Sequence, residues 1–246
     1  MRKLIFSLCA LLALAGGVLG AKRPNFVFLV SEDNSIHYLK LYGYGASMPN
    51  IEALAREGLT FNHAFSCSPV CSVARSTLAT GMLAPRGGFQ YHRKSALAKL
   101  PPGFTPWSGM LRKVGYYTAN NAKTDYNFAH NMKTLWNQSS RKASWRNREK
   151  GQPFFFMQSF EASHESSLHF PRRVMETQKT THDPAKVKLA PYHPDTPTFR
   201  YTHARYLDRH QVIDDQIGAV MKQLASDGLL EDTFIFYFGD HGGVLP

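Results

Sequence analysis

The sequence predicts an α/β fold built on a parallel sheet. Unbroken apolar runs occupy residues 26–30 and 234–238, and a third lies in the segment that begins at residue 152. Continuous runs of this length are typical of strands buried on both faces, as in parallel sheets. Between the last two runs, residues 201–225 have the apolar periodicity of a long amphipathic helix. Strands and helices therefore alternate along the chain.

Acidic residues follow two of these strands directly. Glu32 and Asp33 come after the first strand, and Asp240 and His241 after the last. Ligands of α/β proteins bind at the carboxyl ends of the strands. Adjacent carboxylates repel each other, and calcium or magnesium relieves the repulsion with oxygen ligands. We expect the two strands to be neighbours that share a cation; a solvated turn and a Gly-rich turn are the alternatives.

The helices between the strands have recognisable ends. Residues 48–61 predict a helix that stops at Gly58, and residues 103–128 predict a helix from Thr105 to Gly115, followed by a short strand at 116–119.

Later in the chain, the proline-rich segment 171–197 predicts a long loop that lines a substrate cleft, with His182 and His193 as surface or substrate-contacting groups rather than metal ligands. On the 201–225 helix, three aspartates are expected to form ordinary salt bridges or face water: Asp208, Asp214 and Asp215.

The segment CSVARSTLATG, residues 71–81, predicts a helix over residues 72–79 with Cys71 at its start. Unpaired backbone N–H groups and the helix dipole favour an anion there, so Cys71 is a candidate nucleophile or nucleophile precursor. The i, i+4 spacing places Arg75 on the same face, where its guanidinium suits a tetrahedral oxyanion. A disulfide between Cys67 and Cys71 is the alternative.

Residues 1–20 have the layout of a secretory signal peptide, with cleavage before Ala21 and residues 21–246 as the mature chain. Their apolar run is shorter than the ~20 residues that a membrane span needs, so we expect no stable span and a periplasmic or secreted protein. Loss of Arg2 and Lys3 lowers the formal charge from +11 to +9. This charge favours polyanions, and since no nucleic-acid motif is present, a sulfated polysaccharide rather than nucleic acid.

The residues CSVAR followed by TLATG resemble the signature of the type I sulfatases, which belong to the alkaline-phosphatase-like superfamily. The resemblance implies a three-layer α/β/α domain with its site at the carboxyl edge of the sheet. It also implies that a formylglycine-generating enzyme or an anaerobic sulfatase-maturing enzyme oxidises Cys71 to formylglycine, which Arg75 orients. Val73 departs from the family, which usually has Pro or Ala at that position.

The same resemblance implies a metal site. Sulfatases carry two aspartates after the first strand, matched here by Glu32 and Asp33, and an Asp followed by His or Asn, matched by Asp240 and His241. With residue 71, these side chains are the expected ligands of a divalent metal, most suited to Ca²⁺.

Three further residues match or replace family positions. Lys123 fits the lysine of a Gly-Lys-x-His element that contacts sulfate. Asp125 stands where the histidine would be, so proton abstraction from formylglycine falls to another group or to Asp125 itself. His164 matches a histidine that faces the ester oxygen, as leaving-group contact or general acid. On sequence alone, the alternatives are that Lys123 is a solvated surface lysine and that His164 is a hydrogen-bonded loop residue.

The implied reaction is hydrolysis of sulfate esters, on sulfated sugars or polysaccharides. One hydroxyl of hydrated formylglycine attacks the sulfur of the ester, and the alcohol leaves. The other hydroxyl then expels sulfate and regenerates the aldehyde. A phosphoester hydrolase of the same superfamily is one alternative, and an inactive fragment or non-catalytic binder of sulfated glycans is another. Sulfatases normally continue beyond the element matched at residues 240–241, so we expect the N-terminal part of a catalytic domain, truncated at its C-terminus.

Overall fold

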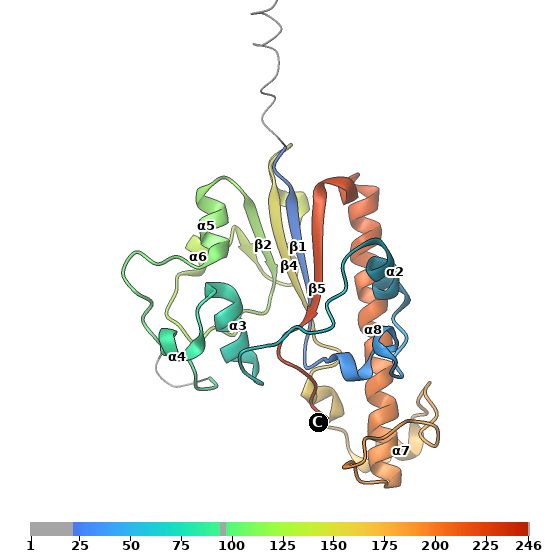
Figure 1. The fold of residues 1–246 in the computed structure, drawn as a ribbon. Helices are drawn as coiled ribbons and strands as arrows, with labels where there is room; N and C mark the ends of the chain where they lie inside the picture. Colours follow the sequence, from blue (N-terminus) through green and yellow to red (C-terminus); the bar gives the residue numbers. More distant parts are fainter. Residues whose placement is uncertain (1–21, 94–96, 246) are drawn as a thin grey trace, which may run out of the picture.

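A computed structural model describes residues 22–93 and 97–245. They form a parallel sheet of five strands in the order β3-β2-β4-β1-β5 (Figure 1). The strands are β1 (Asn25–Ser31), β2 (Tyr117–Asn121), β3 (Gln138–Ser139), β4 (Phe154–Phe160) and β5 (Thr233–Gly239). The predicted signal peptide, residues 1–20, lies outside the described residues.

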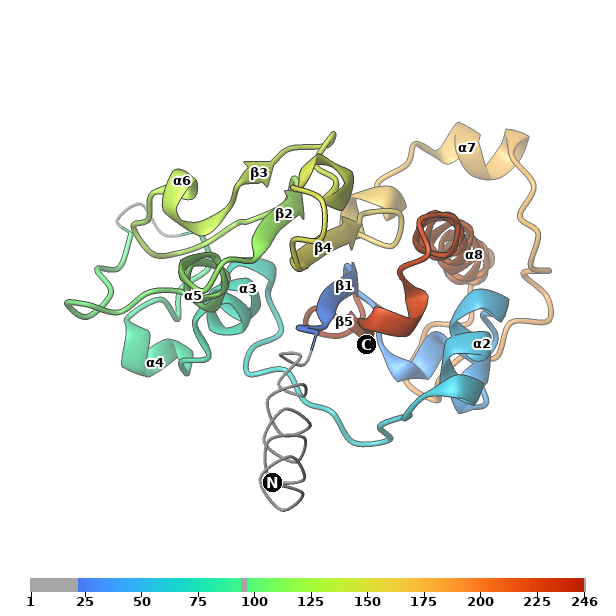
Figure 2. The ribbon, with the colours of Figure 1, turned by 90° about the horizontal axis from the view of Figure 1, so that it is seen from above.

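Helices cover both faces of the sheet, as Figure 2 shows, which confirms the three-layer α/β/α expectation. One face carries α3 (Cys71–Thr80), α4 (Ala84–Gly87), α5 (Trp107–Lys113) and α6 (Met132–Leu135). The other carries α2 (Pro49–Glu57), α7 (Arg172–Thr177) and α8 (Pro197–Ser226). Short 3-10 turns are η1 (Ile36–Tyr38), η2 (Lys40–Tyr42), η3 (Trp145–Asn147), η4 (Glu165–Leu168) and η5 (Leu230–Asp232). Among the described residues, no helix combines the length and apolar composition needed to cross a bilayer.

The sheet separates two hydrophobic clusters. Alternate residues of β4 face opposite layers: Phe154 and Phe156 belong to the cluster with α8, whereas Phe155 and Met157 belong to the cluster with α3 and α5. All four side chains are buried. The apolar run is unbroken because both faces of the strand are covered.

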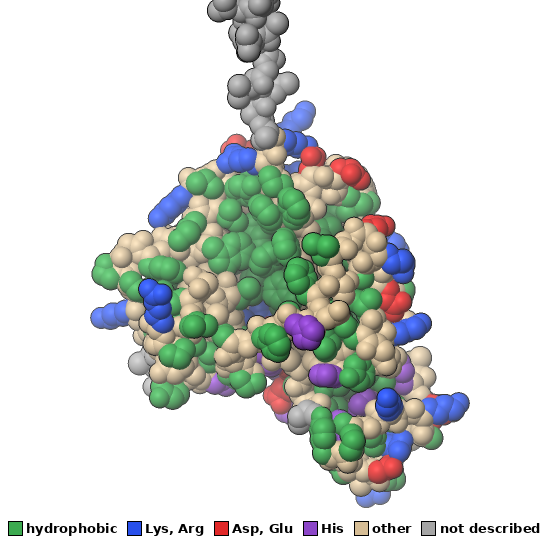
Figure 3. All heavy atoms as spheres, viewed as in Figure 1, with side chains coloured by type: hydrophobic (Ala, Val, Ile, Leu, Met, Phe, Trp, Pro, Cys, Tyr) green, Lys and Arg blue, Asp and Glu red, His purple; other side chains and the backbone are tan. Residues whose placement is uncertain are grey.

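β5 is an edge strand with an incompletely covered face. The side chains of Phe234 and Phe236 are 58% and 45% exposed. They stack on or lie edge-on to Phe26 and Phe28 of β1. Figure 3 shows the apolar surface that results over the centre of this face. Apolar patches of this kind mark surfaces against which other protein segments pack.

The expectation that Asp214 forms an ordinary salt bridge or faces water is wrong. Asp214 is fully buried on α8 and accepts hydrogen bonds from the backbone N–H groups of Asn50 and Ile51, at 3.1 and 3.0 Å, and from Asn50 Nδ2 at 2.8 Å. The residue before α2 is Met48, whose side chain makes no capping hydrogen bond. Asp214 therefore supplies from α8 the carboxylate that α2 lacks.

The segment 171–197 also differs from its prediction, because it contains the short helix α7 within the expected loop. His182 in this segment bonds through Nδ1 and through its backbone N–H to Asp208 of α8. This contact holds the segment against the long helix.

Replacement of Asp214 by alanine should lower the free energy of unfolding by about 2–4 kcal/mol, because it removes the cap of α2 and leaves buried donors unpaired. Urea unfolding followed by circular dichroism measures the change. The matched control is Asp215→Ala, an exposed neighbour on the same helix, which should shift stability by less than about 0.5 kcal/mol. Equal midpoints for the two variants would contradict this assignment.

Candidate metal and catalytic site

The candidate site lies where β1, β5 and α3 meet, at the lower edge of the sheet in Figure 1. β1 pairs in parallel with β5, and Ser31 lies opposite Gly239. The backbone N–H of Asp240 continues the ladder by donating to the carbonyl of Ser31 at 3.1 Å. The expectation that the two acidic strand ends are neighbours is confirmed.

Four side chains converge at this point. Asp33, Cys71, Asp240 and His241 each offer one ligand atom, and these atoms all lie within 4.8 Å of one another. His241 Nε2 is 2.8 Å from Asp33 Oδ1, 3.2 Å from Cys71 Sγ and 3.6 Å from Asp240 Oδ1. Two carboxylates, a thiol and an imidazole are an appropriate donor set for a metal ion.

The electrostatics of these groups favour positive charge between them. Burial acts to lower the pKa of His241, but bonding to Asp33 and Cys71 outweighs burial and raises it to about 10. Burial acts to raise the pKa of Asp33, but hydrogen bonds from His241 and from the backbone N–H of Glu165 lower it. The position therefore stabilises a cation, and the residues present fit a divalent metal.

Glu32 is fully buried but is not one of the four converging groups. Its Oε1 lies 3.2 Å from Arg75 Nη2, and its Oε2 forms an ion pair with Lys123 Nζ. Burial raises the pKa of Glu32, although the charges of Arg75 and Lys123 act in the opposite direction. The structure thus directs this carboxylate toward the cationic side chains of the site.

Arg75 connects the two acidic strand ends. It projects from α3 one turn after Cys71, and its Nη2 lies 3.2 Å from both Glu32 Oε1 and Asp240 Oδ2. Its Nη1 donates to Ser159 Oγ of β4 at 2.9 Å. The guanidinium is therefore held by contacts with three side chains, Glu32, Asp240 and Ser159.

His164 reaches the same group from the segment after β4. Its Nε2 lies 4.0 Å from Glu32 Oε2, and its Nδ1 is 2.8 Å from Ser166 Oγ. Lys123 and His164, which the sequence places far apart, thus share Glu32 as a neighbour.

Asp125 does not join this group. Its two carboxylate oxygens accept hydrogen bonds from Arg93 Nε and Nη2, at 3.1 and 2.9 Å. Both cysteines in the described part of the chain are free, with Cys67 exposed and Cys71 buried, so the alternative of a disulfide is wrong.

Sequence reasoning missed Ser72, His92, Arg93 and Ser159. Ser72 Oγ is 2.9 Å from His92 Nδ1 and accepts a hydrogen bond from the backbone N–H of Arg93 at 3.0 Å. The only sequence signal is the adjacent basic pair at 92–93, which is too common to identify a site.

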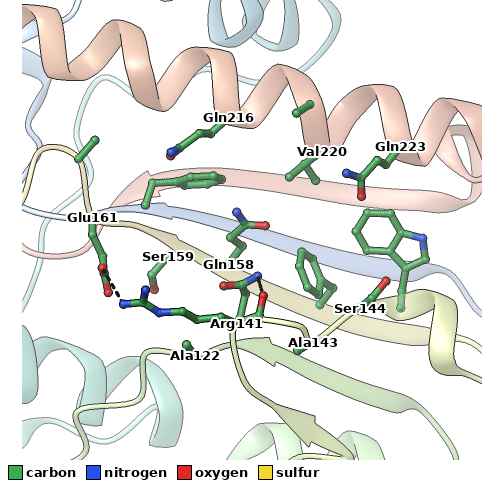
Figure 4. Close-up of a pocket in the computed structure, with 16 residues that line it drawn as sticks. Ala122, Arg141, Ala143, Ser144, Gln158, Ser159, Glu161, Gln216, Val220 and Gln223 are labelled. Atoms are coloured by element: carbon green, nitrogen blue, oxygen red, sulfur yellow. Dashed lines mark hydrogen bonds and ion pairs between the residues drawn. The ribbon is translucent and has the colours of Figure 1, made fainter.

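A groove of about 690 Å³ borders the site between α8 and β4. Figure 4 shows Gln216 and Val220 of α8 opposite Gln158 and Ser159 of β4, with Arg141 at the side. Ser159 of β4 lines this groove and also accepts a hydrogen bond from Arg75 Nη1.

Comparison with known proteins places this geometry in a family. The sulfatase family model matches residues 24–245. The chain is 34% identical to an ulvan-active sulfatase of Formosa agariphila, over 92% of this chain and 44% of that protein. It is 25% identical to N-acetylgalactosamine-6-sulfatase of Mus musculus, over 99% of this chain and 55% of that protein. The chain thus spans about half the length of these relatives.

Solved structures share the fold. The putative sulfatase yidJ of Bacteroides fragilis superposes with a TM-score of 0.71 at 19% identity, over 93% of this chain and 65% of that one. A phosphonate monoester hydrolase of Agrobacterium radiobacter gives a TM-score of 0.68 at 16% identity, over 89% of this chain and 63% of that one. The fold is therefore the alkaline-phosphatase-like one that the sequence predicts, and the chain belongs to the sulfatase family.

Proposed function

We propose that this chain hydrolyses sulfate esters on sulfated sugars or polysaccharides. The observation that carries the proposal is the convergence of Cys71 with Asp33, Asp240 and His241 within 4.8 Å. A residue that becomes a nucleophile is thereby held against a set of metal ligands. Membership of the sulfatase family supports the reaction, and the relatives named for ulvan and N-acetylgalactosamine support a glycan substrate.

In this proposal, Cys71 is converted to formylglycine by a dedicated maturing enzyme. As its hydrate, formylglycine supplies one hydroxyl that attacks sulfur, and the S–O bond to the alcohol breaks as the alcohol leaves. The second hydroxyl then loses its proton and expels sulfate, which regenerates the aldehyde. Cys71 is the first residue of α3. The positive end of the helix dipole at this position favours the ionised form of that hydroxyl.

Asp33, Asp240, His241 and residue 71 would hold a divalent metal, and Ca²⁺ suits the two carboxylates best. Such an ion stabilises negative charge on the oxygens of the transferring group. The role of Glu32 as a ligand, implied by the family resemblance, stays a prediction. Its contacts with Arg75 and Lys123 support a role in orienting these cationic groups.

The remaining side chains act on the ester. Arg75 and Lys123 neutralise charge where the sulfate oxygens become more negative, which is where fixed cations accelerate a reaction most. His164, beside Glu32, is the proposed leaving-group contact or general acid.

A phosphoester hydrolase is the second candidate, because a phosphonate monoester hydrolase shares the fold and phosphate is also a tetrahedral anion. A higher kcat/KM for a sulfate ester than for the matching phosphate ester would decide for the first proposal. Export to the periplasm or outside remains part of the proposal and rests on residues 1–20.

Cys71 should be recovered as formylglycine when the chain is exported from cells that contain a maturing enzyme. Mass spectrometry of the peptide that contains residue 71 detects the conversion. Cys71→Ser should abolish turnover of 4-nitrophenyl sulfate, whereas the control Cys67→Ser, at the exposed cysteine, should retain it. Equal activity of the two variants would exclude the proposed nucleophile.

The chain should bind Ca²⁺ through the four converging groups. Asp33→Asn should weaken Ca²⁺ binding by at least about tenfold, since affinity follows the number of charged ligands. Isothermal titration calorimetry measures the affinity without any substrate. Asp215→Asn, on the exposed face of α8, is the control and should bind Ca²⁺ as the unsubstituted protein does; a matching loss in both variants would refute the site.

Lys123→Met should lower kcat/KM for 4-nitrophenyl sulfate by about 10²–10³-fold, the usual effect of losing one group that stabilises developing negative charge. Lys142→Met, at an exposed lysine, serves as the control. Unchanged kcat/KM in Lys123→Met would mean that this lysine only neutralises Glu32.

A further inference from the structure

A short turn, residues 91–93, is attached to the first turn of α3 beside Cys71. The attachment point is Ser72, which is fully buried. Its Oγ accepts a hydrogen bond from the backbone N–H of Arg93 at 3.0 Å and lies 2.9 Å from His92 Nδ1. Ser72 thus fixes the turn that carries His92 to the start of α3, next to Cys71.

These contacts determine which ring nitrogen of His92 carries its proton. Ser72 Oγ already accepts from Arg93, and a buried hydroxyl must also donate its own hydrogen to avoid a desolvation penalty. The acceptor within reach is His92 Nδ1. In the neutral ring the proton therefore resides on Nε2, which becomes a hydrogen-bond donor on the side of the ring away from Ser72.

The charges around His92 keep the ring neutral. Desolvation and the positive charge of Arg93 lower its pKa, and the charges of His241 and Lys123 act in the same direction, against Asp125. Two of these groups, His241 and Lys123, belong to the site itself. The geometric link of His92 to the site is its contact with Ser72, the residue that follows Cys71 at the start of α3.

A bidentate ion pair holds the turn in this place. Both oxygens of Asp125 accept from the Arg93 guanidinium, at 3.1 and 2.9 Å. Arg93 and Asp125 both have left-handed backbone conformations, with φ of 42° and 50°, which are unfavourable for residues other than glycine. The ion pair joins these two strained points and connects the turn to the segment that carries Lys123.

We propose that His92 is a substrate-contacting residue whose Nε2–H donates a hydrogen bond to an oxygen of the sulfate ester, and that Ser72, Arg93 and Asp125 are positioning residues. This inference rests on the proposed function. It accounts for the departure of Lys123-Thr124-Asp125 from the lysine-histidine pattern. Here the aspartate fixes a turn from another part of the chain, and that turn supplies the histidine.

Three substitutions separate substrate contact from a purely structural role. Asparagine retains an acceptor near the place of Nδ1, which suits Ser72, whereas glutamine retains a donor near the place of Nε2. Leucine retains neither. His92→Gln should therefore retain more sulfate affinity and activity than His92→Asn and His92→Leu, although the lost acceptor for Ser72 lowers both below the unsubstituted protein.

The test compares kcat/KM for 4-nitrophenyl sulfate with the affinity for inorganic sulfate, measured by isothermal titration calorimetry on the full chain. His92→Asn and His92→Leu should lower kcat/KM by about 10–10³-fold and weaken sulfate binding by at least about tenfold, as for loss of a hydrogen bond to a charged group. His63→Leu, at an exposed histidine before α3, should change neither value.

The possible outcomes separate the role of His92 from the proposed sulfatase function. If His92→Asn equals the unsubstituted protein while His92→Gln does not, His92 only supports Ser72 and the inference is overturned. If the unsubstituted protein binds sulfate but hydrolyses no ester, the proposed function fails, and the sulfate affinities of the variants still decide the role of His92. If the protein binds no sulfate, the substrate contact is overturned with it.

Discussion

The parallel pairing of β1 with β5 is the constraint on which the site depends. It places the segment 32–33 beside the segment 240–241, although about two hundred residues separate them. The pairing also creates an electrostatic problem, because Glu32, Asp33 and Asp240 are buried together. Several carboxylates buried close together require compensating positive charge or hydrogen bonds. Arg75, Lys123 and His241 supply part of it, and the fit of the remaining position to a divalent metal follows from the same requirement.

The helix α3 packs on one face of the sheet and brings two side chains to the acidic strand ends, Cys71 and Arg75. It begins at Cys71, so its N-terminal N–H groups face the region where an oxyanion would form. One turn later Arg75 enters the space between the acidic strand ends. Removal of Arg75 would take away the cation that two buried carboxylates share, Glu32 and Asp240, so its contribution to folding cannot be separated from its contribution to chemistry. The same helix anchors the 91–93 turn through Ser72.

Much of the architecture could be predicted from the sequence, because the signals are local. The apolar runs identify β1, β4 and β5, and the Cys71 helix appears where its motif predicts it, as Cys71–Thr80. Asp125 shows the limit of such reasoning. Its position in a family pattern indicates a place near residue 71, but its carboxylate is engaged by Arg93, from a segment with no pattern of its own. The prediction for Asp214 is wrong for a related reason, because an aspartate on a helix gives no sign that it caps another helix.

The sequence by itself determined the α/β class, the order of the main elements and the chemical types gathered at the strand ends. These follow from hydrophobic periodicity and from residues adjacent to each strand, which act over a few positions. Only the tertiary structure decided that Glu32 faces Arg75 and Lys123, that Asp214 caps α2, and that Ser72 holds the turn of His92 and Arg93. These contacts join side chains from separate segments, and their partners are selected by the packing of helices on the sheet, which no local pattern encodes.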